Sequence, residues 1–96
     1  MTLRLTLVSR TDCHLCDELR AGVVRLAAGY DVALEEVDVD ASPDLEARWG
    51  DRVPVLFLGT VEAGREICHH FLDEGRLLAL LADCAGPAAR NASANP

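Results

Sequence analysis

A change of hydrophobic period near residue 10 constrains the fold of this chain more than any other feature. Residues 3–8 (LRLTLV) alternate and then become apolar, which is typical of a strand buried on at least one face. From Leu15 to about residue 28, apolar residues recur at helical spacing, and Gly29 follows where a helix commonly ends in a left-handed residue. The chain therefore begins with a strand, a short loop and a helix.

The rest of the chain continues in alternating elements. We expect, in chain order, a strand at 32–39, a short helix from Ser42-Pro43 to Gly50, a strand at 54–58, a fourth strand at 61–67 and a last helix around 72–81. Asp73 is the predicted cap of that last helix. The order β-α-β-α-β-β-α predicts an α/β fold, a four-stranded mixed sheet flanked by helices.

Composition narrows the class of protein. With 96 residues we expect one domain at 1–85, followed by a disordered tail at 86–96 that has little to bury. No apolar run approaches the ~18 residues of a membrane-spanning helix, and the N-terminus lacks the pattern of a signal peptide. The net charge is −7 and no basic cluster occurs, which argues against nucleic acid as a partner. We expect a cytoplasmic monomer with neither membrane nor nucleic-acid partners.

Cysteine usage points to the chemistry. The chain has four cysteines, at positions 13, 16, 68 and 84. In a reducing compartment a close Cys-x-x-Cys pair is more often redox-active or metal-binding than structural. Cys13 falls at the start of the predicted helix, with Thr11 or Asp12 as its cap, and unpaired amides there stabilise a thiolate. Cys16 follows one turn later on the same side, more enclosed and close enough to form a disulfide.

With Cys-x-x-Cys directly after the first strand and Val53-Pro54 at the start of the third, the sequence resembles the thioredoxin superfamily. Its single βαβ start is similar to the glutaredoxins, and it most resembles the short bacterial glutaredoxin-like proteins, over roughly residues 1–84. The resemblance implies the thioredoxin fold and a thiol-disulfide oxidoreductase, with Cys13 as nucleophile and Cys16 as resolving thiol.

The resemblance also implies substrate-binding residues. It places a cis Val53–Pro54 peptide opposite the cysteines, where the Val53 backbone would pair with an extended substrate segment. Arg52 beside it is a candidate contact for a substrate carboxylate, with an ordinary surface arginine as the alternative. His14, between the two cysteines, is a candidate for tuning thiolate stability. The expected partners are protein or small-molecule disulfides, with glutathione as a possible co-substrate or a reductase as the source of electrons, and no resident cofactor.

The sequence departs from the family pattern at three places. Asp12 stands where thioredoxins usually carry Trp, and His14-Leu15 stands where glutaredoxins usually carry Pro-Tyr. The Gly-Gly that helps glutaredoxins hold glutathione is not matched in the segment 67–73 (ICHHFLD). Glutathione is therefore one of two open choices of reductant.

Other interpretations stay open. The cysteine pair could belong to a non-catalytic binding module that holds a metal, a cluster or a protein partner. In one form, Cys13 and Cys16 bind zinc together with Cys68 and His69 or His70. Cys68 is interpreted as a core residue at a strand end rather than a third redox thiol, and the two histidines as loop residues. Cys84 is expected to have no chemical role.

Overall fold

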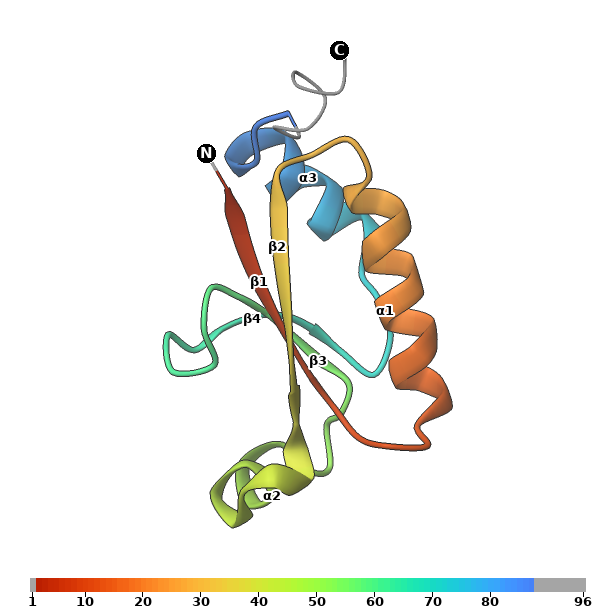
Figure 1. Cartoon of the computed structure of the whole chain (residues 1–96), viewed down its shortest axis with the longest axis vertical. Coiled ribbons are helices and arrows are strands. Elements are labelled where there is room, and N and C mark those ends of the chain that lie inside the picture. Colours follow the sequence, from red (N-terminus) through yellow and green to blue (C-terminus); the bar gives the residue numbers. More distant parts are fainter. Residues whose placement is uncertain (1, 88–96) are drawn as a thin grey trace.

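The computed structural model describes residues 2–87 and contains one four-stranded sheet, with the first and last helices alongside it and the middle helix at one end (Figure 1). The elements are, in chain order, β1 (Leu3–Ser9), α1 (His14–Ala27), β2 (Val32–Asp38), a 3₁₀ turn (Val39–Ala41), α2 (Pro43–Trp49), β3 (Val55–Leu58), β4 (Arg65–His69) and α3 (Glu74–Cys84). The predicted order β-α-β-α-β-β-α and the α/β class are confirmed. Within the described range, no helix combines the length and apolar character needed to span a bilayer.

The sheet is mixed, as predicted, and its strands lie in the order β2-β1-β3-β4. β1 pairs in parallel with β2 because the connection through α1 returns the chain to the same end of the sheet. β3 pairs antiparallel with both β1 and β4. β1 is therefore a central strand, and its alternate side chains reach both faces of the sheet.

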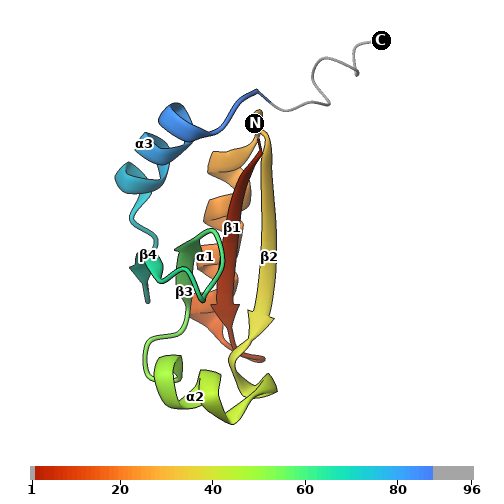
Figure 2. The same ribbon diagram turned by 90° about the vertical axis from the view of Figure 1, so that its left-hand side faces the viewer.

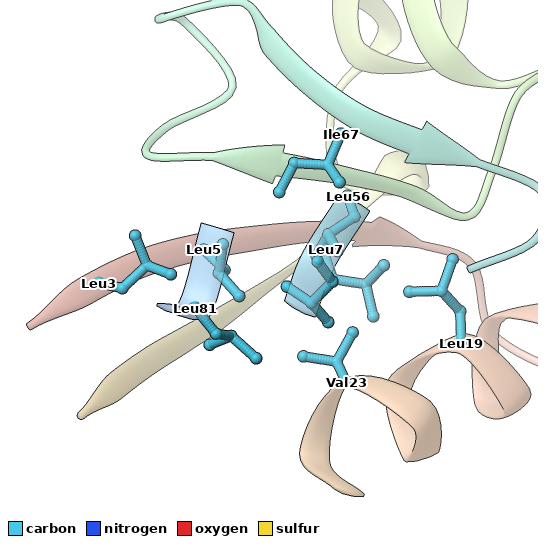
Figure 3. Packing of buried hydrophobic residues seen from close by; sticks show 9 residues of the cluster. Leu3, Leu5, Leu7, Leu19, Val23, Leu56, Ile67 and Leu81 are labelled. Atoms are coloured by element: carbon cyan, nitrogen blue, oxygen red, sulfur yellow. The ribbon is translucent and has the colours of Figure 1, made fainter. Parts of the chain in front are cut away.

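One face of the sheet is covered by α1 and α3. Leu7 on β1 and Leu56 on β3 pack with Val23 on α1, as Figure 3 shows from close by. The cluster consists of Leu3, Leu5, Leu7, Leu19, Val23, Leu56, Ile67, Leu77 and Leu81. Because Leu19 and Val23 are four residues apart, the predicted helical stripe of α1 is the one that meets the strands.

The other face carries a smaller cluster beside α2, which lies at the end of the sheet toward which β1 and β2 run (Figures 1 and 2). Phe57 of β3 meets the edge of Trp49 of α2, with ring centroids 4.9 Å apart and planes at 80°. The Ser42 hydroxyl caps α2 by accepting from the amides of Asp44 and Leu45. The predicted start at Ser42-Pro43 and the end at Gly50 are confirmed.

The fourth strand begins later than predicted. Residues 60–64 form a turn in which the Ala63 amide donates to the Thr60 carbonyl over 3.2 Å and the Gly64 amide to the Val61 carbonyl over 3.0 Å. Gly64 adopts a left-handed conformation with φ 72°. The prediction of a strand from residue 61 is wrong because Val61 lies in this turn. Its side chain is buried there against the smaller cluster beside α2.

Two residues expected in the tail are held against the fold. The Asp31 amide donates to the Gly86 carbonyl over 2.7 Å, and Tyr30 forms an antiparallel bridge with Pro87. The part of the chain that contacts the domain therefore extends two residues past the predicted boundary at 85. The prediction of a disordered tail for residues 88–96 lies outside the described residues.

Candidate active site

Cys13 and Cys16 form a disulfide at the start of α1, with their Cα atoms 5.2 Å apart. Cys13 is itself the helix cap: its backbone is extended, and its sulfur accepts the Cys16 amide over 3.1 Å. The predicted cap at Thr11 or Asp12 is wrong, because Asp12 adopts a left-handed conformation with φ 58° and the chain enters the helix one residue later. The sulfur of Cys13 thus occupies the position where helix amides lack partners.

The two cysteines differ in exposure. Cys13 is half-buried, whereas Cys16 is 0% exposed and belongs to the buried residues of α1. An incoming molecule can therefore reach Cys13 before Cys16. The enclosure expected for Cys16 from its place one turn along the helix is present in the structure.

A charged flank lies on one side of the pair and consists of Ser9, Asp17, Arg20 and Glu36. Glu36 of β2 accepts the Ser9 hydroxyl over 2.6 Å and the Arg20 Nε over 2.7 Å, with a second contact to Arg20 Nη2. Arg20 also donates to Asp17 over 2.9 Å. The Arg20 guanidinium holds the pKa of Glu36 below its usual range, with help from Ser9, and Glu36 and Asp17 together raise the pKa of Arg20. The flank ties α1 to β2 beside the cysteines.

A groove lined by both apolar and charged residues lies on the opposite side of α1, about half a helical turn away from Asp17 and Arg20. It lies between α1 and the segment that connects β4 to α3, which runs alongside α1 in Figure 1. Its volume is about 250 Å³, and it is lined by Leu15, Glu18, Leu19, Gly22, Arg25, His70, Phe71, Leu72 and Glu74.

The groove is built on a close approach of two segments. A Cβ atom at Gly22 would lie 2.6 Å from Leu72 Cδ2, so the end of the Leu72 side chain occupies the space that glycine leaves open beside α1. Arg25 and Glu74 form an ion pair of 3.0 Å across the groove, toward the C-terminal half of α1. The near end is Leu15, the residue between His14 and Cys16.

The Val53–Pro54 peptide is cis and stands just before β3. Val55 pairs with Val8, so Pro54 is at the end of the sheet where β1 leads into the cysteine loop. His70, itself left-handed with φ 65°, donates its amide to the Pro54 carbonyl over 2.8 Å. Its ring Nε2 lies 3.1 Å from the Asp51 carbonyl, which makes Nε2 the protonated nitrogen. These bonds join the β4–α3 corner to the Pro54 corner.

The other two predicted substrate contacts have partners within the chain. Arg52 donates to Glu66 over 3.2 Å, and its guanidinium lies 5.8 Å from the centre of the Trp49 ring. His14 is 84% exposed in the first turn of α1, with Nε2 2.7 Å from a Glu18 carboxylate oxygen. Their predicted roles toward substrate stay predictions.

The other cysteines and His69 lie in β4 and at the end of α3. Cys68 lies within β4, half-buried against the larger core cluster, and this burial raises the pKa of its thiol. His69 Nδ1 lies 2.6 Å from Glu66. Among residues 2–87, no group of three or more His, Cys, Asp and Glu side chains is placed to hold a metal ion, so the zinc interpretation gains no support. Cys84 is exposed at the end of α3.

Sequence reasoning missed the groove. The sequence places Leu15 and Leu19 only in the apolar stripe of a helix, and no periodic pattern marks Phe71, which is 69% exposed. The available signal is the pair of large apolar residues, Phe71 and Leu72, between polar His70 and the helix cap Asp73. The signal was incomplete, because nothing local says that this segment lies against α1.

Comparison with known proteins identifies a family. A model described as the glutaredoxin-like domain (DUF836) matches residues 4–82. An uncharacterized protein of Mycobacterium tuberculosis, Rv0508, is 36% identical over 84 residues and the match covers 82% of each chain.

Solved structures agree with this match. Protein XcR50 of X. campestris has 39% identity and a TM-score of 0.65, over 83% of this chain and 97% of its own. Protein Ne2328 of Nitrosomonas europaea has 35% identity and a TM-score of 0.69, over 82% of this chain and 91% of its own. Wheat glutaredoxin, at 23% identity and a TM-score of 0.55 over 85% of this chain and 81% of its own, shares the fold.

Proposed function

This chain belongs to the glutaredoxin-like domain family (DUF836), and from that premise we propose that it is a thiol-disulfide oxidoreductase acting through Cys13 and Cys16. The observation that carries the proposal is the Cys13–Cys16 disulfide at the first turn of α1, in which Cys13 is half-buried and Cys16 is fully buried. A pair that forms a disulfide across one helical turn can store and release two electrons without moving the rest of the fold.

In the first step, the reduced Cys13 thiolate attacks one sulfur of a substrate disulfide. The Cys13–substrate bond forms, the substrate disulfide breaks, and its other sulfur leaves as a thiolate that takes a proton from water. The Cys16 amide, which donates to the Cys13 sulfur, stabilises negative charge there, and the α1 dipole acts in the same direction.

In the second step, Cys16 loses its proton and attacks the Cys13 sulfur of the mixed disulfide. The second substrate thiol is released and the Cys13–Cys16 disulfide remains, so the substrate gains two electrons and the pair loses two. An external thiol reductant, glutathione or a reductase, then returns the pair to the dithiol.

The substrate segment is expected at the Pro54 corner. Val53 is half-buried at the end of the sheet where the cysteine loop begins, and this is the end at which an extended segment would pair with its backbone. This supports protein disulfides as substrates, alongside small-molecule disulfides.

Turnover of a small neutral disulfide, hydroxyethyl disulfide, tests the proposal with glutathione and with a dithiol as reductant in parallel. Cys13→Ser should lower the rate by more than about hundredfold, because the serine hydroxyl is not ionised at neutral pH. Cys84→Ser is the matched control and should keep the wild-type rate, since Cys84 is exposed at the far end of α3. Equal rates for wild type and Cys13→Ser would remove Cys13 as the nucleophile.

A further inference from the structure

We propose that the groove beside Leu15 is a specificity site, whose apolar residues Leu15, Phe71 and Leu72 receive a bulky apolar side chain of a protein substrate near the substrate's reacting cysteine. The inference rests on the proposed oxidoreductase function and names the substrate class that the site selects. The occupant is an extended peptide segment with a large aliphatic or aromatic residue and neutral or basic neighbours.

The position of the groove is the first argument. Leu15 lies between the two cysteines, and the groove continues along α1 to Gly22 and Arg25. The path from Leu15 to Gly22 covers seven residues, or roughly 10 Å along a helix. About three residues of extended chain span the same distance. If a substrate chain runs along α1 from a cysteine held at Cys13, side chains one to three positions away lie over the groove.

The groove surface is the second argument. Leu19 on its floor is 1% exposed and belongs to the core, whereas Phe71 on its wall is 69% exposed. Covering the exposed ring with an apolar side chain removes apolar surface of both partners from water. The volume of about 250 Å³ is smaller than the ~300–1,000 Å³ of a site for a drug-sized ligand, and it suits one inserted side chain.

The charges around the groove select the neighbours of that side chain. Glu18 and Glu74 stand on its rim with Arg25, and Arg25 is already paired with Glu74. Two carboxylates and one guanidinium leave a single net negative charge at the rim, within a chain of net charge −7. Acidic neighbours on a substrate are therefore disfavoured, and neutral or basic ones are accepted.

The test uses synthetic peptides with one cysteine carried as a mixed disulfide with 2-thiopyridine, which absorbs light when released. The residue two positions from the cysteine is Ala, Phe or Glu. The full chain is reduced beforehand, and the second-order rate constant for each peptide is divided by the constant for free cysteine under the same conditions. The corrected ratio of the Phe to the Ala peptide measures recognition and cancels the intrinsic reactivity of the peptide.

For the wild-type chain, the corrected Phe/Ala ratio should be about ten, which corresponds to partial burial of one aromatic side chain. Phe71→Ser should reduce the ratio to about three or less, because half of the apolar contact is lost. Val24→Ser is the matched control: Val24 is a 60% exposed apolar residue of the same helix outside the groove, and the ratio should stay near ten. The Glu peptide should react more slowly than the Ala peptide, and Glu18→Gln should narrow that gap.

The outcomes separate the two proposals. If the chain reacts with every peptide faster than free cysteine does but the Phe/Ala ratio is near one, the groove proposal fails and the oxidoreductase proposal stands. If the chain reacts with no peptide faster than free cysteine does, both the groove proposal and the oxidoreductase proposal fail. A Phe71→Ser ratio equal to that of the wild type also overturns the groove. So does a wild-type dimer in size-exclusion chromatography that Phe71→Ser converts to a monomer, because the groove would then hold a second copy of the chain.

Discussion

The charged flank and the groove lie on opposite sides of α1, next to the same cysteine pair, and differ in composition. The flank is polar throughout, whereas the groove combines charged residues with exposed apolar ones. In the charged flank, Glu36 is bonded to Ser9 and Arg20, so the polar groups satisfy one another within the chain. In the groove, Phe71 leaves an aromatic ring exposed to water. A surface whose groups are mutually paired gains little from a partner, whereas an exposed apolar surface gains by being covered.

This difference assigns separate tasks to the two sides. The charged flank links α1 to β2 and so contributes to stability, while the wall of the groove contributes to recognition. The floor of the groove is the exception, because Leu19 belongs to both the groove and the core. Substitutions in the three places should therefore change the free energy of unfolding by clearly different amounts.

The largest effect is expected at the groove floor. Leu19→Ala removes a side chain that is 1% exposed and should lower the free energy of unfolding by about 3 kcal/mol, through lost burial and the cavity left behind. Urea titration followed by circular dichroism measures it. Val24→Ala on the exposed side of the same helix is the control and should stay within about 0.5 kcal/mol of wild type. A Leu19→Ala loss as small as the control's would mean that the groove floor is not part of the core.

A smaller effect is expected in the charged flank. Glu36→Gln at pH 7 replaces a carboxylate that Arg20 and Ser9 both contact, and should lower the free energy of unfolding by about 1 kcal/mol. The value is modest because the Glu36 side chain is about one third exposed and water screens the pair. Asp44→Asn, which weakens an exposed ion pair with Arg48 on α2, is the comparison and should have less effect. An equal loss for the two variants would contradict a special role for the flank.

Acid should remove the contribution of Glu36. Its pKa in the folded chain is lowered, chiefly by Arg20, so its stabilisation is fully present above the unfolded-state pKa of about 4.3 and is lost as pH falls through the folded-state pKa. The gap in unfolding free energy between wild type and Glu36→Gln should therefore be constant from pH 7 to about pH 5 and shrink at lower pH. Urea titrations of both proteins at pH 7, 5 and 3.5 measure this gap. A gap that widens in acid would reverse the sign of the assigned shift.

The smallest effect is expected at the groove wall. Phe71→Ser should change the free energy of unfolding by no more than about 0.5 kcal/mol, because the ring is 69% exposed and little burial is lost. The measurement is the same urea titration. A loss comparable to that of Leu19→Ala would show that Phe71 is structural, and its surface would then no longer contrast with the charged flank.

Much of the fold could be predicted from local patterns. The change of period near residue 10 predicted β1 and α1, and Ser42-Pro43 predicted the start of α2 because cap and first-turn preferences act within a few residues. The start of β4 could not be predicted in the same way. An apolar residue such as Val61 can be buried whether it lies in a strand or in a turn, so its apolar character does not distinguish the two.

The candidate site divides in the same manner. The spacing of Cys13 and Cys16 predicted a disulfide across one helical turn, and the buried second cysteine follows from its place on the helix. The predicted helix cap, Thr11 or Asp12, lies one or two residues before the actual cap, Cys13. The difference arises because Asp12 takes a left-handed conformation in the β1–α1 loop, which the local sequence does not predict.

By itself, the sequence determined the order of strands and helices and the placement of two sulfurs at a helix start, because hydrophobic period, capping and residue spacing act over a few residues. Only the tertiary structure decided what surrounds that pair. Gly22 and Leu72 are fifty positions apart and meet only when α1 packs beside the β4–α3 segment, and Ser9 meets Glu36 only when β1 pairs with β2. Such contacts depend on how separate elements pack together, and no local period in the chain encodes them.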